Sequence, residues 1–213
     1  MLKVGLTGGI AAGKSTVGEM LVALGAHLIR ADEISHELML PGGTVYDEVV
    51  RHFGREILDP DGKVNRKRLA EAAFGGGSGR SRIEELNRIV HPAVLRKQEQ
   101  WMEEIGRRDP AGIAMVEAAL ILEAGARGQF DRLMVVTCRS EQRIERWARR
   151  TGVDEASARA EVTRRMAAQW PDEEKVRAAD FVIDNSGPLS ETETQVRTIF
   201  PRLQREATGK AKS

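Results

Sequence analysis

Two nearly continuous runs of hydrophobic residues dominate the second half of the chain. They occupy Ile113–Leu122 and Leu133–Cys138, and such runs are typical of central parallel strands that are covered on both faces. Shorter strand candidates occur at Lys3–Thr7, Ala26–Ala31 and Phe181–Asp184. The pattern therefore predicts a parallel sheet of five strands.

Helical patterns fill the segments between these strands. Ser15–Leu24 is amphipathic and follows the first strand directly. Residues 42–112 carry helical patterns without a long strand-like run, and residues 140–175 contain two more, joined around 151–154. Because strands alternate with helices, we expect an α/β fold with a doubly wound parallel sheet, interrupted by a helical insertion and a helical flap.

Glycine and proline mark several boundaries inside this outline. The GGGSG sequence at 75–79 predicts a flexible turn. We expect Pro92 in the first turn of a helix that continues to Ile105, because proline is tolerated there. The last residues, 209–213, are small and polar, which predicts a flexible tail.

Composition narrows the function without identifying it. The 213 residues include 33 Lys or Arg and 32 Asp or Glu, so a net charge of +1 gives no reason to expect nucleic acid or an anionic membrane as a partner. The single cysteine, Cys138, excludes an internal disulfide framework and suits a reducing compartment. No stretch of about 18 apolar residues could span a bilayer. We expect a cytoplasmic protein that is a monomer or a weak homo-oligomer.

The sequence GGIAAGKST, from Gly8 to Thr16, follows the first strand and opens the first helix. It matches the phosphate-binding loop pattern, in which glycines let successive backbone N–H groups point at phosphate oxygens. The helix that follows adds the positive end of its dipole. Lys14 is expected to reach the β- and γ-phosphates, and the Ser15 hydroxyl to ligate Mg²⁺. A plain glycine-rich turn is the alternative, but the strand before it and the helix after it favour a phosphate loop.

This loop alone does not separate a switch GTPase, an ATPase motor and a small-molecule kinase. The chain has no Asn-Lys-x-Asp sequence to recognise guanine and no Leu-Ser-Gly-Gly-Gln signature of ABC-type ATPases. The remaining pattern is typical of a kinase, in which an inserted region holds the acceptor and a flap closes over both substrates.

Asp32 follows the second predicted strand, at the edge where the carboxyl ends of parallel strands meet. One interpretation makes it the general base that accepts the proton of the acceptor hydroxyl. The other makes it the N-cap of a helix over residues 33–39, a position that Asp favours. The residues alone leave both interpretations open.

Arg143, Arg146 and Arg150 share one helix face in the flap sequence SEQRIERWARR. Such a face could clamp triphosphate oxygens and neutralise charge in the transition state. It could also be a solvated face that pairs with Glu141 and Glu145. The phosphate loop upstream and the position after a strand's carboxyl end favour the clamp.

Three further features have both a plain and a functional interpretation. The segment 184–187 after the last strand is either an ordinary turn or a loop that touches adenine. His91 is either a buried, capped histidine or a contact to the acceptor. Cys138 is expected to pack inertly.

Taken together, these residues resemble the dephospho-coenzyme A kinase family over nearly the whole chain. Glu117 and Ala119 stand where that family more often has Asp and Pro. The matching pieces are GLTGGIAAGKST, Ala31-Asp32, the segment at 41–74, His91-Pro92, LILE at 120–123, the arginine flap, RMAAQW around Gln169 and FVIDNSG at 181–187.

The resemblance implies transfer of the ATP γ-phosphate to the ribose 3′-hydroxyl of dephospho-CoA, with Mg²⁺, in a nucleoside-monophosphate-kinase-like P-loop fold. It implies a core at 1–41, 113–139 and 176–208, an acceptor-binding region at 42–112 and a lid at 140–175, followed by the tail at 209–213.

The resemblance also assigns residues to roles. It favours Asp32 as the catalytic base and names Lys14 and Arg146 as the other catalytic residues. Ser15 is expected to be the metal ligand. Asp32 is expected to bind the acceptor with His91, Leu120 and Glu123. The residues expected to bind ATP are Gly8, Gly9, Ala11, Ala12, Gly13, Lys14, Ser15, Thr16, Arg146, Arg150, Asn185 and Gly187.

Two alternatives to this function stay open. One is a P-loop kinase that phosphorylates another small hydroxyl compound or a nucleoside monophosphate. The other is a nucleotide-binding switch or assembly module that has no acceptor.

Overall fold

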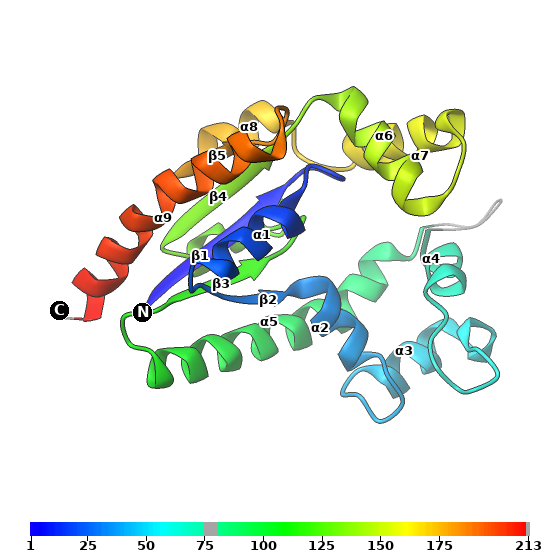
Figure 1. The fold of residues 1–213 in the computed structure, drawn as a ribbon. Coiled ribbons are helices and arrows are strands. Elements are labelled where there is room, and N and C mark those ends of the chain that lie inside the picture. The colour runs from blue at the N-terminus through cyan, green and yellow to red at the C-terminus, as the bar shows by residue number, and fades with distance from the viewer. Residues whose placement is uncertain (75–80, 212–213) are drawn as a thin grey trace. The chain divides into compact units, whose positions relative to one another are not determined.

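A single five-stranded sheet organises the computed structural model, which describes residues 1–74 and 81–211 (Figure 1). The strand order is β2-β3-β1-β4-β5, and the pairs β1–β3, β1–β4 and β4–β5 are parallel. The prediction of a parallel α/β sheet is confirmed. The strands are β1 (Leu2–Gly8), β2 (His27–Arg30), β3 (Ile113–Glu117), β4 (Arg132–Thr137) and β5 (Phe181–Asp184).

The core of the sheet is apolar because its central strands are buried along their length. Every residue of β3 is buried, as are the middle four residues of β4. Helices α1 (Lys14–Ala23) and α9 (Leu189–Ala211) contribute to the same hydrophobic cluster as these strands, through residues such as Val17, Leu21 and Phe200. This packing fixes the start of α1, and with it the loop that joins β1 to α1.

The chain divides into two compact units, Met1–Ile29 with Met102–Ser213, and Arg30–Trp101. The predicted role of 42–112 in acceptor binding stays a prediction. Within the described residues, the elements of the second unit after β2 are helices. This unit begins at the end of β2, and the last turns of its long helix belong to the first unit. Its elements are α2 (Ala31–Leu38), α3 (Tyr46–Phe53), η1 (Arg55–Ile57), α4 (Arg66–Phe74) and the first part of α5 (Ile83–Arg108).

The remaining elements of the first unit follow β3 and β4. Gly152 ends α6 in a left-handed conformation, which agrees with the predicted junction at 151–154. These elements are η2 (Ala126–Gln129), α6 (Ser140–Thr151), α7 (Glu155–Ala167) and α8 (Asp172–Ala178). Among the described residues, no helix is both long enough and apolar enough to cross a membrane.

Several predicted boundaries are wrong. The strand predicted at Ile113–Leu122 ends at Glu117, because Ile121 and Leu122 are buried in a turn rather than in the sheet. Helix α5 begins at Ile83, so Pro92 lies in its interior, where its missing N–H removes one helical hydrogen bond. Helix α9 continues to Ala211, so the predicted tail is helical over 209–211. The turn predicted at 75–79 and residues 212–213 lie outside the described residues.

Candidate active site

The sequence GGIAAG joins β1 to α1, the context that a phosphate loop requires. Gly13 has φ +100°, and a Cβ added there would lie 2.0 Å from the Asn185 amide nitrogen. A Cβ at Gly9 would lie 2.0 Å from a guanidinium nitrogen of Arg143. Neither position can accept a side chain as the loop stands, so the close backbone approach demands glycine at both.

Helix α1 begins at Lys14, directly after the loop. The first N–H groups of a helix have no partner within it and carry the positive end of its dipole, so they suit an anion. The Lys14 ammonium curls back over the loop and donates to the carbonyls of Gly8 at 3.0 Å and Gly9 at 3.1 Å. A cation and a helix N-terminus therefore meet at the same short stretch of backbone.

Ala11 gives the loop a second unusual backbone position. Among the described residues it is the one non-glycine with positive φ, at +52°. This left-handed conformation costs an alanine roughly 1–2 kcal/mol, so neighbouring contacts must hold it. The carbonyl of the next residue, Ala12, accepts from Asn185 Nδ2 at 2.9 Å and from Arg146 Nη1 at 3.3 Å.

Asn185 and Arg146 tie the end of β5 and helix α6 to the loop. Asn185 is buried; its amide oxygen accepts from Thr192 Oγ1 at 2.9 Å, and its carbonyl accepts from Arg146 Nη2 at 2.8 Å. The predicted contact of Asn185 and Gly187 with adenine stays a prediction. The amide of Asn185 already serves the loop in this structure, which the sequence did not indicate.

Ser15 and Glu117 form the oxygen pair that a magnesium ion would need. The Ser15 hydroxyl donates to Glu117 Oε1 at 2.7 Å, and Glu117 is buried at the end of β3. Hydroxyl and carboxylate oxygens are hard ligands, and Mg²⁺ beside phosphates is usually held by one or two such protein groups. These two residues therefore fit the ion.

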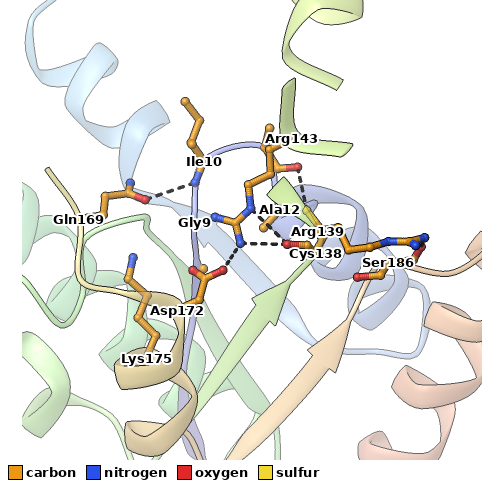
Figure 2. A network of polar contacts seen from close by, with 12 residues as sticks. Gly9, Ile10, Ala12, Cys138, Arg139, Arg143, Gln169, Asp172, Lys175 and Ser186 are labelled. Carbon is orange, nitrogen blue, oxygen red and sulfur yellow. Dashed lines mark hydrogen bonds and ion pairs between the residues drawn. The ribbon is translucent and has the colours of Figure 1, made fainter. Parts of the chain in front are cut away.

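Arg143 lies in the interior, contrary to both interpretations of the arginine face. Its side chain is 1% exposed. Its Nε and Nη2 donate to the Cys138 carbonyl at 3.3 and 3.2 Å, and Nη2 also donates to Asp172 (Figure 2). It thus joins the end of β4 to the start of α8, beside Gly9.

The other two arginines differ from Arg143 and from each other. Arg146 donates to the loop carbonyl of Ala12 at 3.3 Å, and its predicted contact with ATP stays a prediction. Arg150 is exposed, and its guanidinium lies 4.7 Å from the centre of the Trp147 ring. Glu141 pairs with Arg159 on α7, whose hydrogen bond lowers the pKa of Glu141.

Two of the residues expected to bind the acceptor lie in the second unit. Asp32 is exposed in the first turn of α2, but Arg30 occupies the N-cap, so the capping interpretation of Asp32 is wrong. His91 is exposed on α5, and its interpretation as a buried histidine is wrong too. Their predicted roles as base and acceptor contact stay predictions.

Leu120 and Glu123 lie in the turns after β3, in the first unit. Leu120 is 42% exposed. Glu123 Oε1 accepts from the Trp170 backbone at 2.8 Å and lies 2.9 Å from the Lys175 ammonium. These partners belong to the segment that leads into α8, and none of them supports the predicted contact with the acceptor.

A family model described as dephospho-CoA kinase matches residues 2–191. The chain belongs to the dephospho-CoA kinase family. It is 40% identical over 199 residues to the dephospho-CoA kinase of Geobacter sulfurreducens, covering 93% of this chain and 97% of that one. It is 37% identical over 206 residues to the dephospho-CoA kinase of Aquifex aeolicus, covering 97% and 100%. The enzyme is therefore a kinase that uses ATP to phosphorylate dephospho-CoA, giving coenzyme A.

Solved structures agree with the fold of a dephospho-CoA kinase. The Thermus thermophilus protein TT1252 has a TM-score of 0.76 and 30% identity, covering 95% of this chain and 97% of that one. The dephospho-CoA kinase of Campylobacter jejuni has a TM-score of 0.61 and 22% identity, covering 95% and 97%.

The structure of this dephospho-CoA kinase family member also reveals contacts that no sequence pattern indicated. Gln169 Oε1 accepts from the Ile10 backbone at 3.3 Å, and Lys175 is fully buried beside Glu123. Asp172 pairs with Arg143. A lysine and an aspartate in the charged sequence PDEEK look like solvated residues, so no sequence signal distinguished them.

Proposed function

We propose that the phosphate loop and α1 hold ATP, and that Asp32 activates the ribose 3′-hydroxyl of dephospho-CoA. The observation that carries this proposal is the loop itself, where two glycines allow no side chain and a lysine lies over the backbone at a helix N-terminus. This arrangement is what the binding of a nucleoside triphosphate requires.

The charges around the loop match the needs of phosphoryl transfer. The transition state spreads negative charge over the transferred phosphate, so fixed cations and N–H dipoles stabilise it. In this proposal Lys14, which lies over the loop backbone, follows the β- and γ-phosphates, and Arg146, which donates to the Ala12 carbonyl, contacts the same oxygens. Ser15 and Glu117 would hold Mg²⁺, which would neutralise charge on the phosphates.

The transfer forms a bond between the ribose 3′-oxygen and the γ-phosphorus and breaks the bond from that phosphorus to the β,γ-bridging oxygen. The 3′-hydroxyl proton passes to Asp32. An exposed carboxylate in the first turn of α2 can accept this proton and orient the hydroxyl. We also propose that Arg150, Asn185 and Gly187 contact the bound ATP.

A panel of acceptors tests this function. We expect ATP consumption to rise many-fold when dephospho-CoA is added, and to change little with AMP, shikimate or water alone. Equal rates with all four would reject dephospho-CoA as the acceptor.

Lys14→Ala should abolish transfer with dephospho-CoA, since no other residue of the loop carries a positive charge. The monomeric or weakly oligomeric state and the cytoplasmic location are predictions too, and light scattering tests the first.

A further inference from the structure

The left-handed turn at Ala11 needs contacts that hold it. On its carboxyl side, the Ala12 carbonyl is fixed by Asn185 and Arg146. On its own carbonyl, the buried Cys138 thiol approaches at 3.9 Å, a weak contact. On its amino side, the Ile10 N–H donates to Gln169 Oε1 at 3.3 Å. Gln169 therefore supplies the polar contact on one side of the strained residue.

Ile10 is also held by its side chain. It is 7% exposed and packs in a small hydrophobic cluster with Ile144 of α6 and Ala158 and Val162 of α7, against which Ala11 also lies. The phosphate loop and the α6–α7 pair thus share one cluster. Gln169 comes shortly after α7 and accepts a hydrogen bond from the backbone of Ile10, a member of this cluster.

The segment that carries Gln169 is anchored on its other side. Glu123 Oε1 accepts from the Trp170 backbone at 2.8 Å and pairs with Lys175 at 2.9 Å. Lys175 is fully buried, and a buried ammonium must keep its carboxylate partner because an uncompensated charge there is strongly destabilising. Asp172, between them, pairs with the buried Arg143 (Figure 2). Residues 170–175 are thus anchored by three polar contacts, and the Gln169 side chain reaches Ile10 from the start of this segment.

We propose that Gln169 is a positioning residue for the phosphate loop. Its amide oxygen accepts the Ile10 N–H and keeps Ala11 in the left-handed conformation, so that the following N–H groups face the phosphates of ATP before ATP arrives. Neutral glutamine suits this position because a carboxylate would put negative charge next to those phosphates. The inference rests on the proposed function in one respect, that ATP binds at this loop.

A double-mutant cycle with Ala11 tests this role. Gln169→Met preserves side-chain length and removes the acceptor, and Ala11→Gly removes the steric cost of the left-handed conformation. Gln204→Met is the matched control, since Gln204 is exposed on α9. The affinity for Mg·ATP is measured by calorimetry without acceptor, and thermal melting checks that each variant is folded. Gln169→Asn, whose shorter side chain would not reach Ile10, serves as a second variant.

We expect Gln169→Met to raise the Kd for ATP by about fivefold, and Gln204→Met to leave it within about 1.5-fold, with similar melting temperatures. In the Ala11→Gly background the same change should raise Kd by less than about twofold, because glycine adopts the left-handed conformation without the steric cost that the Gln169 contact offsets in alanine. An unchanged Kd in Gln169→Met, or an equal rise in both backgrounds, would overturn the proposal. The binding measurement needs no acceptor. A wild-type protein that binds ATP but does not phosphorylate dephospho-CoA would therefore refute the proposed function without deciding the role of Gln169.

Discussion

Replacing Gly13 with alanine probes the closest approach in the phosphate loop. Gly13 precedes α1 with φ +100°, and a Cβ there would lie 2.0 Å from the Asn185 amide nitrogen. That nitrogen is not at the free end of a flexible chain. Asn185 is buried, donates to Ala12 at 2.9 Å and accepts from Thr192 at 2.9 Å. The new methyl group must therefore displace a residue that is fixed at both ends.

The magnitude follows from two contributions. The left-handed conformation costs an alanine about 1–2 kcal/mol relative to glycine. Displacing Asn185 breaks two buried hydrogen bonds, each of which contributes about 1 kcal/mol. We therefore expect Gly13→Ala to lower the free energy of unfolding by about 3–4 kcal/mol in total. The same displacement distorts the loop that we propose binds ATP. We expect at least about 1.4 kcal/mol of binding free energy to be lost, which lowers ATP affinity by roughly tenfold or more.

Gly25 supplies the matched control. It has φ +107°, and a Cβ there would meet nothing within 4 Å. Gly25→Ala therefore carries the backbone cost alone, about 1–2 kcal/mol, and should leave ATP affinity unchanged. Urea unfolding gives the stability of both variants, and calorimetry gives their affinity for Mg·ATP. Equal destabilisation by the two substitutions would show that the contact between Gly13 and Asn185 does not constrain the loop, and would refute the reasoning.

Three further predictions concern the chemistry and the charges of the enzyme. Asp32→Asn should lower kcat by roughly 10²–10⁴ with little change in ATP affinity if Asp32 is the general base. The control is Asp47→Asn, which should have no effect because Asp47 is an exposed acid in the first turn of α3. Steady-state kinetics that show equal kcat for both variants would contradict the role of Asp32 as base. Ser15→Ala should raise the Mg²⁺ concentration needed for half-maximal rate, and an unchanged requirement in a metal titration would exclude Ser15 as a ligand. The hydrogen bond from Arg82 lowers the pKa of Glu85 to about 2. The stability that this carboxylate contributes should therefore be present above its unfolded pKa and lost as the pH falls toward 2. An NMR titration that places the pKa of Glu85 at its ordinary value would contradict the ion pair with Arg82.

The parts of the fold that were predictable from the sequence are those with a local signal. Apolar runs identified the sheet, and the GGIAAGKST motif placed the phosphate loop, because both patterns lie within a few consecutive residues. Ile121 and Leu122 show the limit of this signal. They are as apolar as a strand and equally buried, but they lie in a turn, so hydrophobicity recorded their burial and not their backbone conformation.

The contacts that hold the loop were not predictable because they join residues far apart in the chain. Arg143 shares its helical spacing with Arg146, yet one is buried against Cys138 and the other touches Ala12. Helical spacing gives the face of a helix, not what covers that face. Lys175 is similar, since only its distant partner Glu123 distinguishes it from a solvated lysine.

The central claim is that phosphate held by this loop is transferred to the 3′-hydroxyl of dephospho-CoA. The most direct measurement uses ATP labelled with ¹⁸O in its γ-phosphate, with mass spectrometry and ³¹P NMR of the acceptor after the reaction. We expect the label to enter a single new phosphate on the ribose 3′-oxygen of coenzyme A, and the Lys14→Ala variant to yield none. Label found only in inorganic phosphate, or on another position of the acceptor, would contradict it.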